Sequence, residues 1–178
     1  MRKLTNDEII ARQQKKLTEP RIPITVVLNN IRSLYNVGSI FRTADGVGVE
    51  KIQLCGITGF PPQSQIAKTA LGAEERVAWN HDRDVLKVIR DLKKVGYQIV
   101  LLEQMDQSLE YHDFSPQFPL CLVVGNEVEG ISAELTSLCD AAVEIPMAGI
   151  KNSLNVGTAF GIVAYHFRNC YRTKAEQL

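Results

Sequence analysis

Short apolar runs, each about the length of one strand, constrain this chain more than any other feature of its sequence. Residues 120–124 read LCLVV, and residues 24–28 are apolar apart from one threonine. Strands that are apolar along their whole length are typical of parallel sheets, because helices cover both faces of such sheets. Since helical patterns alternate with these runs, the sequence predicts an α/β domain whose mostly parallel sheet is flanked by helices.

Hydrophobic periodicity and chain breakers place the elements along the chain. We expect strands at residues 24–28, 51–55, 98–102, 120–124 and 140–145, and helices near residues 5–17, 36–46, 64–71, 82–95 and 133–138. A closing helix is expected after an N-cap at Ser153 and should run to about Tyr171. We expect one domain over residues 22–178, preceded by an N-terminal helical extension over residues 1–21.

The charge balance argues mildly against a protein that binds nucleic acid through a large net positive field. The chain has 20 Lys and Arg residues and 20 Asp and Glu residues, so RNA binding would depend on local patches. One candidate patch is the segment 1–21, where basic residues outnumber acidic ones, although a solvated helix face explains this segment equally well. Residues 103–118 carry acidic residues and no Lys or Arg, so we expect them to face away from phosphate.

The sequence also argues against a membrane or a zinc protein. It has no apolar stretch long enough to cross a membrane and no signal-peptide pattern at its start, so we expect a cytosolic protein without a membrane partner. The four cysteines show no CxxC or Cys/His ligand spacing, so we expect free, mostly buried thiols and no metal site. These cysteines are Cys55, Cys121, Cys139 and Cys170.

Three polar segments follow predicted strands, at residues 29–46, 125–132 and 146–157. Ligands of parallel sheets bind in loops at the carboxyl ends of the strands, so we look for the chemistry in these segments. The third segment is the hardest to explain as a plain turn. A helix cap needs one polar side chain, and this segment offers three, namely Asn152, Ser153 and Asn155.

The first two segments each have a structural explanation as well as a functional one. Arg42 is unusual among apolar neighbours on a helix, and it could either form a salt bridge with Asp45 or bind an anion. The second segment could be a simple strand-turn-helix, with Gly130 at positive φ and Ser132 as the cap. Its glycine spacing matches neither a Walker loop nor a dinucleotide fingerprint.

Taken together, the three segments resemble the signature motifs of the SpoU/TrmH branch of the SPOUT methyltransferases, which methylate RNA ribose. Asn36 and Arg42 match motif one, residues 125–130 match motif two, and residues 145–156 match motif three. The similarity spans roughly residues 22–168. It implies a six-stranded parallel sheet with a deep C-terminal trefoil knot, a homodimer, and S-adenosylmethionine as the cofactor held in the knot.

The resemblance also assigns residues to roles. The implied catalytic residues are Asn36, Arg42, Glu127, Ser153 and Asn155. The implied cofactor-binding residues are Val124, Gly125, Asn126, Gly130, Ile145, Met147, Ser153 and Leu154. The implied reaction is methylation of a ribose 2′-hydroxyl in tRNA or rRNA, with tRNA favoured. Two alternatives stay open: a catalytically inactive RNA-binding dimer of the same fold, and a base methyltransferase of the other SPOUT branch.

None of the three motifs contains a histidine, so the usual general base is absent. A guanidinium has a pKa above about 12 and rarely gives up its proton. We therefore hypothesise that Arg42 stays charged, binds an RNA phosphate and stabilises the developing alkoxide, while the phosphate or water accepts the proton. Glu127 would hold Arg42 or Asn36 in place, and Ser153 and Asn155 would orient the ribose or close the cofactor loop.

Two further expectations concern assembly. A domain of this size offers little surface to enclose RNA and cofactor together, so we expect Arg42 of one subunit to serve the cofactor bound by the other. Gly157 and Gly161 lie four residues apart in the closing helix, where glycine is costly, which indicates a close packing contact. That contact could be with the knot, with the partner subunit, or with the chain's own sheet.

Overall fold

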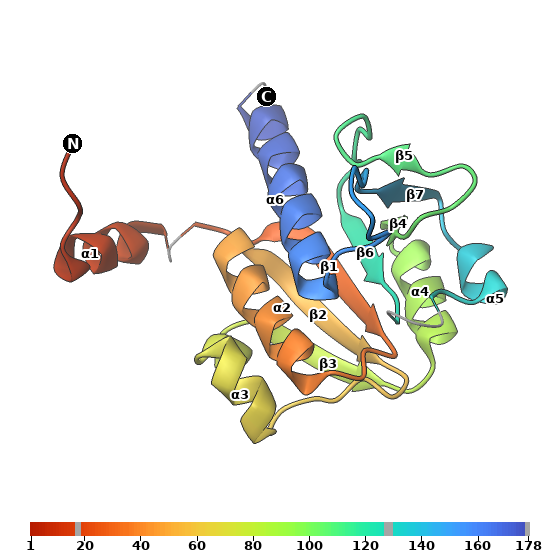
Figure 1. Cartoon of the computed structure of the whole chain (residues 1–178), viewed down its shortest axis with the longest axis horizontal. Coiled ribbons are helices and arrows are strands. Elements are labelled where there is room, and N and C mark those ends of the chain that lie inside the picture. The colour runs from red at the N-terminus through yellow and green to blue at the C-terminus, as the bar shows by residue number, and fades with distance from the viewer. Residues whose placement is uncertain (17–18, 127–129, 177–178) are drawn as a thin grey trace.

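The computed structural model describes residues 1–16, 19–126 and 130–176, with only the backbone at residues 15 and 16. A seven-stranded sheet forms its centre, in the order β3-β2-β1-β6-β4-β7-β5, and all paired neighbours are parallel (Figure 1). The strands are β1 (Ile22–Asn29), β2 (Val49–Cys55), β3 (Ala78–Asp82), β4 (Gln98–Leu102), β5 (Leu109–Glu110), β6 (Leu120–Val124) and β7 (Ala141–Glu144). The predicted α/β architecture with a parallel sheet is confirmed.

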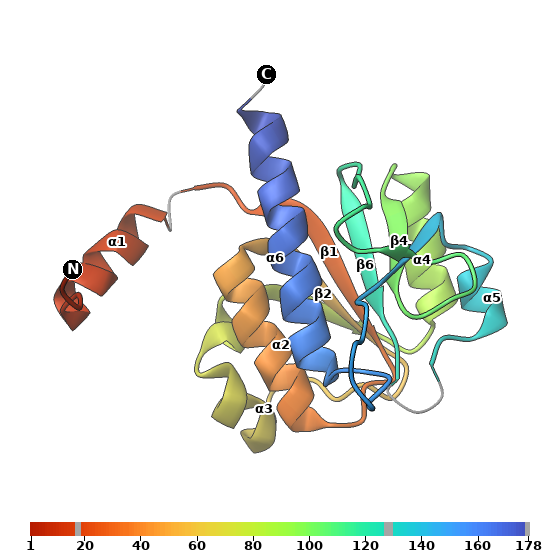
Figure 2. The same cartoon turned by 45° about the horizontal axis from the view of Figure 1, so that its top comes forward.

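Helices cover both faces of the sheet, with α2, α3 and α6 on one side and α4 and α5 on the other (Figures 1 and 2). The helices are α1 (Asn6–Lys16), α2 (Leu34–Val47), α3 (Ser64–Ala70), α4 (Val85–Lys94), α5 (Ala133–Thr136) and α6 (Val156–Ala175), with a short 3₁₀ turn η1 (Ala73–Glu75). Because both faces are covered, every residue of the central strand β6 is buried, as its apolar sequence predicts.

Two strands were not predicted. β3 carries polar side chains and only one paired side, because it lies at the edge of the sheet, and β5 is two residues long. The expected helix over 82–95 is therefore wrong at its start. Residue 82 ends β3, and α4 begins at Val85 after Asp84, whose carboxylate accepts a hydrogen bond from the backbone N–H of Lys87. The sheet also has seven strands where the family resemblance implies six.

The predicted N-cap at Ser153 is wrong as well. Asn155 caps α6, because its Oδ1 accepts hydrogen bonds from the backbone N–H groups of Gly157, at 3.0 Å, and Thr158, at 3.4 Å. The helix continues to Ala175, beyond the expected end. Ser132 does cap α5, and Gly130 does have a positive φ, of 65°.

Helix α6 packs closely on α2. A Cβ atom added at Gly157 would lie 3.2 Å from Ser39 Oγ, and one at Gly161 would lie 3.5 Å from Thr43 Cγ2. The close contact predicted for these glycines is therefore with α2 of the same chain rather than with the sheet.

The salt bridge considered for Arg42 does not form. Asp45 instead pairs with Arg21, at 3.1 Å between Oδ1 and Nη2. All four cysteines are free, and burial raises the pKa of Cys55 and of Cys139 to about 12. Such thiols stay protonated at neutral pH and are poor nucleophiles.

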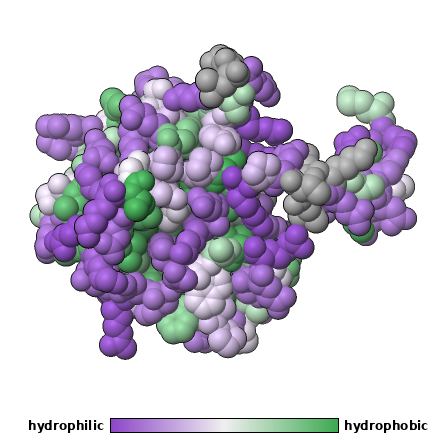
Figure 3. Space-filling view, turned by 180° about the vertical axis from the view of Figure 1, so that it is seen from behind, coloured by the Kyte–Doolittle hydropathy of each residue, from purple (hydrophilic) through white to green (hydrophobic). Residues whose placement is uncertain are grey.

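The outer surfaces differ in character from the covered sheet. Helix α1 stands away from the rest of the chain in both cartoon views (Figures 1 and 2). The rear face is mainly hydrophilic, with hydrophobic side chains in small separate patches among the described residues that it shows (Figure 3). Across the described ranges, no helix has the length and apolar character needed to cross a bilayer.

Candidate active site

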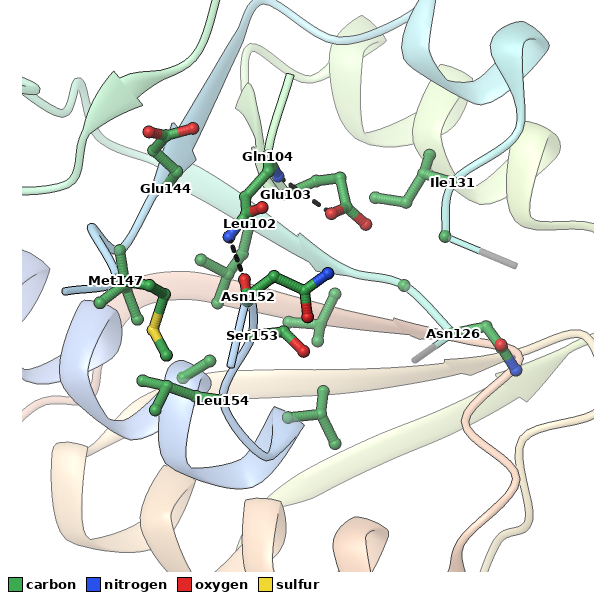
Figure 4. Close-up of a pocket in the computed structure, with 16 residues that line it drawn as sticks. Leu102, Glu103, Gln104, Asn126, Ile131, Glu144, Met147, Asn152, Ser153 and Leu154 are labelled. Carbon is green, nitrogen blue, oxygen red and sulfur yellow. Dashed lines mark hydrogen bonds between the residues drawn. The ribbon is translucent and has the colours of Figure 1, made fainter. Parts of the chain in front are cut away.

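A cavity of about 470 Å³ opens at the carboxyl ends of β4, β6 and β7, beside the start of α6 (Figure 4). Parallel strands end at the same edge of a sheet, so loops that are distant in sequence meet there. The cavity brings together lining residues from three stretches of the chain, which lie within 102–104, 124–131 and 144–159. Residues 127–129 of the middle stretch lie outside the described residues.

All the residues matched to cofactor binding line this cavity. They are Val124, Gly125, Asn126, Gly130, Ile145, Met147, Ser153 and Leu154. The turn after β6 is tight, because a Cβ atom at Gly125 would lie 2.5 Å from Ile131 Cγ1. Gly130 closes the same turn, where its backbone N–H donates to the Asn126 carbonyl at 3.0 Å. Glycine at both places keeps the backbone accessible to a ligand.

Sequence reasoning missed the β4 wall of the cavity, formed by Leu102, Glu103 and Gln104. The Gln104 side-chain amide donates to the backbone carbonyl of Asn152 at 2.6 Å, which ties this wall to the loop before α6 (Figure 4). Glu103 Oε1 accepts from the backbone N–H of Gln104 at 2.9 Å. A strand end without Gly, Asn or Ser does not indicate a ligand-binding site in the sequence. The acidic residue Glu103 was the signal that the sequence offered.

The lining contains both apolar and acidic side chains. Leu102, Val124, Ile145, Met147 and Leu154 supply the apolar surface. The charged residues among the described lining are both carboxylates, Glu103 and Glu144, and Glu144 accepts a short hydrogen bond from the Ser108 hydroxyl. A cavity of this kind suits a flat apolar ring joined to a group with positive charge.

The residues matched to catalysis are only partly brought together. Asn155 Nδ2 donates to Asn36 Oδ1 at 3.1 Å, which joins α2 to the cap of α6 beside the cavity. Ser153 lines the cavity itself. Arg42 is not among the residues that line the cavity. It lies six residues beyond Asn36, or about 9 Å further along α2, and its side chain is exposed. Glu127 lies outside the described residues.

Comparison with known proteins identifies the family. The model of the SpoU rRNA methylase family matches residues 23–165, which include every segment of the cavity. The chain belongs to this family. The resemblance drawn from the three motifs is thereby confirmed.

Members of the SpoU family with names and structures are similar over most of the chain. The tRNA (guanosine(18)-2'-O)-methyltransferase of Escherichia coli is 30% identical over 158 residues, which is 89% of this chain and 65% of that enzyme. The crystal structure of a TrmH/SpoU tRNA modifying enzyme from A. aeolicus superposes with a TM-score of 0.82 at 27% identity, covering 95% of this chain and 85% of that one.

A third relative is described with the cofactor. The AdoMet-bound rRNA methyltransferase of Sinorhizobium meliloti is 29% identical, with a TM-score of 0.78, over 86% of this chain and 59% of that one. This chain spans less than two thirds of the length of the Escherichia coli enzyme.

Proposed function

We propose that this chain transfers a methyl group from S-adenosylmethionine to a ribose 2′-hydroxyl of RNA, with tRNA as the favoured substrate. The observation that carries the proposal is the cavity, since all the residues matched to cofactor binding line it. The name of the Escherichia coli relative, a tRNA 2'-O-methyltransferase, supports the choice of ribose and of tRNA.

The cavity fits S-adenosylmethionine. Its volume of about 470 Å³ lies in the range usual for small-molecule sites, about 300–1,000 Å³. The apolar side chains suit an adenine ring, and the backbone groups around Gly125 and Ile145 could pair with the ring's edge. Glu103 and Glu144 suit the cationic part of the molecule. When bound, this cofactor supplies an activated methyl group on a sulfonium.

The chain's own residues then have the following roles. Arg42 remains charged, binds an RNA phosphate and stabilises the negative charge that develops on the ribose oxygen. Asn155 is a positioning residue, because its side chain both caps α6 and donates to Asn36. Ser153, on the cavity wall, orients the ribose. Glu127, outside the described residues, would hold Arg42 or Asn36.

We further propose a homodimer with a trefoil knot near the C-terminus and with shared active sites. The knot is what the resemblance to the SPOUT methyltransferases implies, and the match to the SpoU family model supports it. The position of Arg42, exposed and outside its own chain's cavity, supports sharing. An arginine that serves the neighbouring cavity must lie on the surface, as Arg42 does.

Sharing is tested by mixing two inactive variants, Arg42→Ala and Leu154→Trp, in denaturant and refolding them together. The mixed dimer then contains one site with an intact cavity from one chain and an intact Arg42 from the other. We expect methyl transfer to reappear in the mixture. If both needed residues came from one chain, every site would be broken and the mixture would stay inactive.

We also propose that residues 1–21 form an extension that contacts RNA. Arg2 pairs with Glu8 at the start of α1, while the exposed helix carries further basic residues. Removal of residues 1–16 should weaken tRNA binding and lower the salt dependence of the binding constant. Equal affinity of the truncated and the full chain for tRNA would assign α1 to a solvated surface instead.

The proposed reaction has a direct test. Calorimetry should show S-adenosylmethionine binding, and tRNA incubated with the protein and cofactor should gain a methyl group that blocks alkaline cleavage after one nucleotide. Methylated RNA that is still cleaved at that nucleotide would indicate base methylation. Cofactor binding and tRNA binding without any transfer would indicate an inactive RNA-binding protein.

A further inference from the structure

A second surface at the carboxyl edge of the sheet lies outside the cavity, in the loop that follows β2. We define the β2 loop as residues 56–60. It exposes two large apolar side chains, since Ile57 is 65% exposed and Phe60 is 42% exposed. Exposed apolar residues that stand singly need no explanation, but two on one short loop beside a candidate active site mark a contact surface.

The β2 loop is held in place by hydrogen bonds, of which the two made by Thr58 are buried. Thr58 is 2% exposed, and its hydroxyl donates to the Leu28 carbonyl at 2.9 Å and accepts from the Ile31 N–H at 3.0 Å. Asn30 Oδ1 accepts from the Ile57 N–H at 3.1 Å. The two exposed side chains are therefore presented on a fixed backbone, which lowers the entropy lost when a partner binds.

Phe60 lies over other aromatic rings. Its ring centroid is 4.4 Å from that of His81 and 6.2 Å from that of Trp79, so its inner side is covered while much of the ring remains exposed. A ring supported from behind and open in front is a stacking surface for another flat ring. Trp79 is the one tryptophan of the chain, which makes it a reporter for this place.

A positively charged side chain lies beside this loop. β3 is the neighbour of β2 in the sheet, so the residues that follow β3 flank the β2 loop, and they include the exposed Arg83. The two described carboxylates next to Arg83 in sequence bind other groups, because Asp82 pairs with Lys87 at 2.9 Å and Asp84 caps α4. An open ring beside an arginine has the chemistry that suits single-stranded RNA, with a base next to a phosphate.

We propose that the β2 loop binds an unstacked base of the RNA substrate, with Phe60 stacking on the base and Arg83 attracting an adjacent phosphate. The proposal rests on the proposed function in so far as the RNA is its substrate. The loop also connects to the cavity. Asn126, which lines the cavity, donates through Nδ2 to the Asn30 carbonyl at 2.9 Å, and the Asn30 side chain holds the loop.

The test uses oligoadenylate and an abasic oligonucleotide of the same length as probes. The two carry the same phosphates, but only oligoadenylate can stack. We expect oligoadenylate to change the fluorescence of Trp79 and the abasic probe to leave it almost unchanged. Phe60→Leu, which keeps an apolar side chain but removes the ring, should weaken oligoadenylate binding about tenfold and leave abasic binding as it is. Arg83→Gln should weaken binding of both probes about equally and reduce its salt dependence.

Leu109→Ala is the matched control, because Leu109 is also an exposed apolar residue but lies on β5, at the opposite edge of the sheet. It should leave binding of both probes unchanged. Unchanged oligoadenylate affinity in Phe60→Leu would overturn the proposal. If Ile57→Asp instead turned a dimer into a monomer without altering RNA affinity, the loop would be a contact between copies of this chain, and the proposal would also fall.

Failure of this proposal can be told apart from failure of the proposed function. If the Phe60→Leu variant binds S-adenosylmethionine, oligoadenylate and tRNA as the unaltered protein does and methylates tRNA equally well, the proposed function stands and the proposed contact between Phe60 and a base is wrong. If the unaltered protein binds no S-adenosylmethionine, the proposed function is wrong, whatever Phe60→Leu does to oligoadenylate binding.

Discussion

The two halves of the sheet's carboxyl edge are built differently, although both consist of loops that follow parallel strands. The half formed by β4, β6 and β7 encloses a cavity, and the loop before α6 is largely exposed, with Ile150 fully so. The half formed by β1 and β2 fills its space with the side chain of Thr58 and exposes a fixed loop. One half is therefore shaped to enclose a small ligand, and the other to present side chains to a large one.

This difference separates ligand binding from stability. Several residues around the cavity are partly exposed, so substitutions there should change affinity more than they change the core. Thr58 is buried and satisfies two backbone groups, so substitutions there should change the free energy of unfolding. Three variants test the division, from the largest expected effect to the smallest.

The largest effect is expected for Leu154→Trp. Leu154 lines the cavity and is 36% exposed, so an indole would occupy ligand space without disturbing the core. We expect a loss of S-adenosylmethionine affinity of about a hundredfold, since an oversized side chain costs about 3 kcal/mol, measured by calorimetry. Ile150→Trp, in the same loop but outside the cavity lining, is the matched control and should bind normally. Normal binding by Leu154→Trp would place the cofactor elsewhere.

Thr58→Val should give the second effect, on stability alone. Valine keeps the shape but leaves the Ile31 N–H and the Leu28 carbonyl without their buried partner, which should lower the free energy of unfolding by about 2 kcal/mol in urea titrations. Cofactor affinity should stay unchanged. Thr136→Val is the control, because its hydroxyl bonds to the Ser132 carbonyl at an exposed site. Equal free energies of unfolding for the two variants would contradict the expectation that Thr58 supports the stability of the fold.

The smallest effect is expected for Gln104→Ala. This change removes one hydrogen bond between the β4 wall and the loop before α6, which should lower S-adenosylmethionine affinity about fivefold, or about 1 kcal/mol. Gln104 is exposed, so the urea midpoint should not move. Gln107→Ala, a nearby exposed glutamine, provides the comparison. A fall in stability without a fall in affinity would show that the bond supports the fold rather than the cavity.

The buried part of the fold was predictable from the sequence, because burial on both faces leaves a simple apolar pattern. The strands at 98–102 and 120–124 were predicted to the residue. β3 was missed because an edge strand needs no continuous apolar run. The start of α6 was predicted two residues too early, because Ser153 and Asn155 both suit an N-cap. Local patterns also carry no information on which strands become neighbours, so the strand order came from the structure.

The candidate site was predictable where glycine, asparagine and serine signalled special backbone. Hence the residues of the second and third segments were found, whereas Glu103 and Gln104, which follow an ordinary strand end, were missed. The distance between Arg42 and the cavity could not be read from the motifs either. It depends on the direction in which α2 runs away from the carboxyl edge, which only the folded chain defines.

Helix α6 begins at the cavity with Val156 and ends with Ala175, about 30 Å away at the side of the sheet where β1 begins (Figures 1 and 2). The helix therefore acts as a natural spacer for laboratory use. A biotin attached beyond Ala175 would hold the protein on a sensor surface with the cavity and the β2 loop turned toward the solution. Tethering through the opposite side, for example near Ile57, would press those same surfaces against the support.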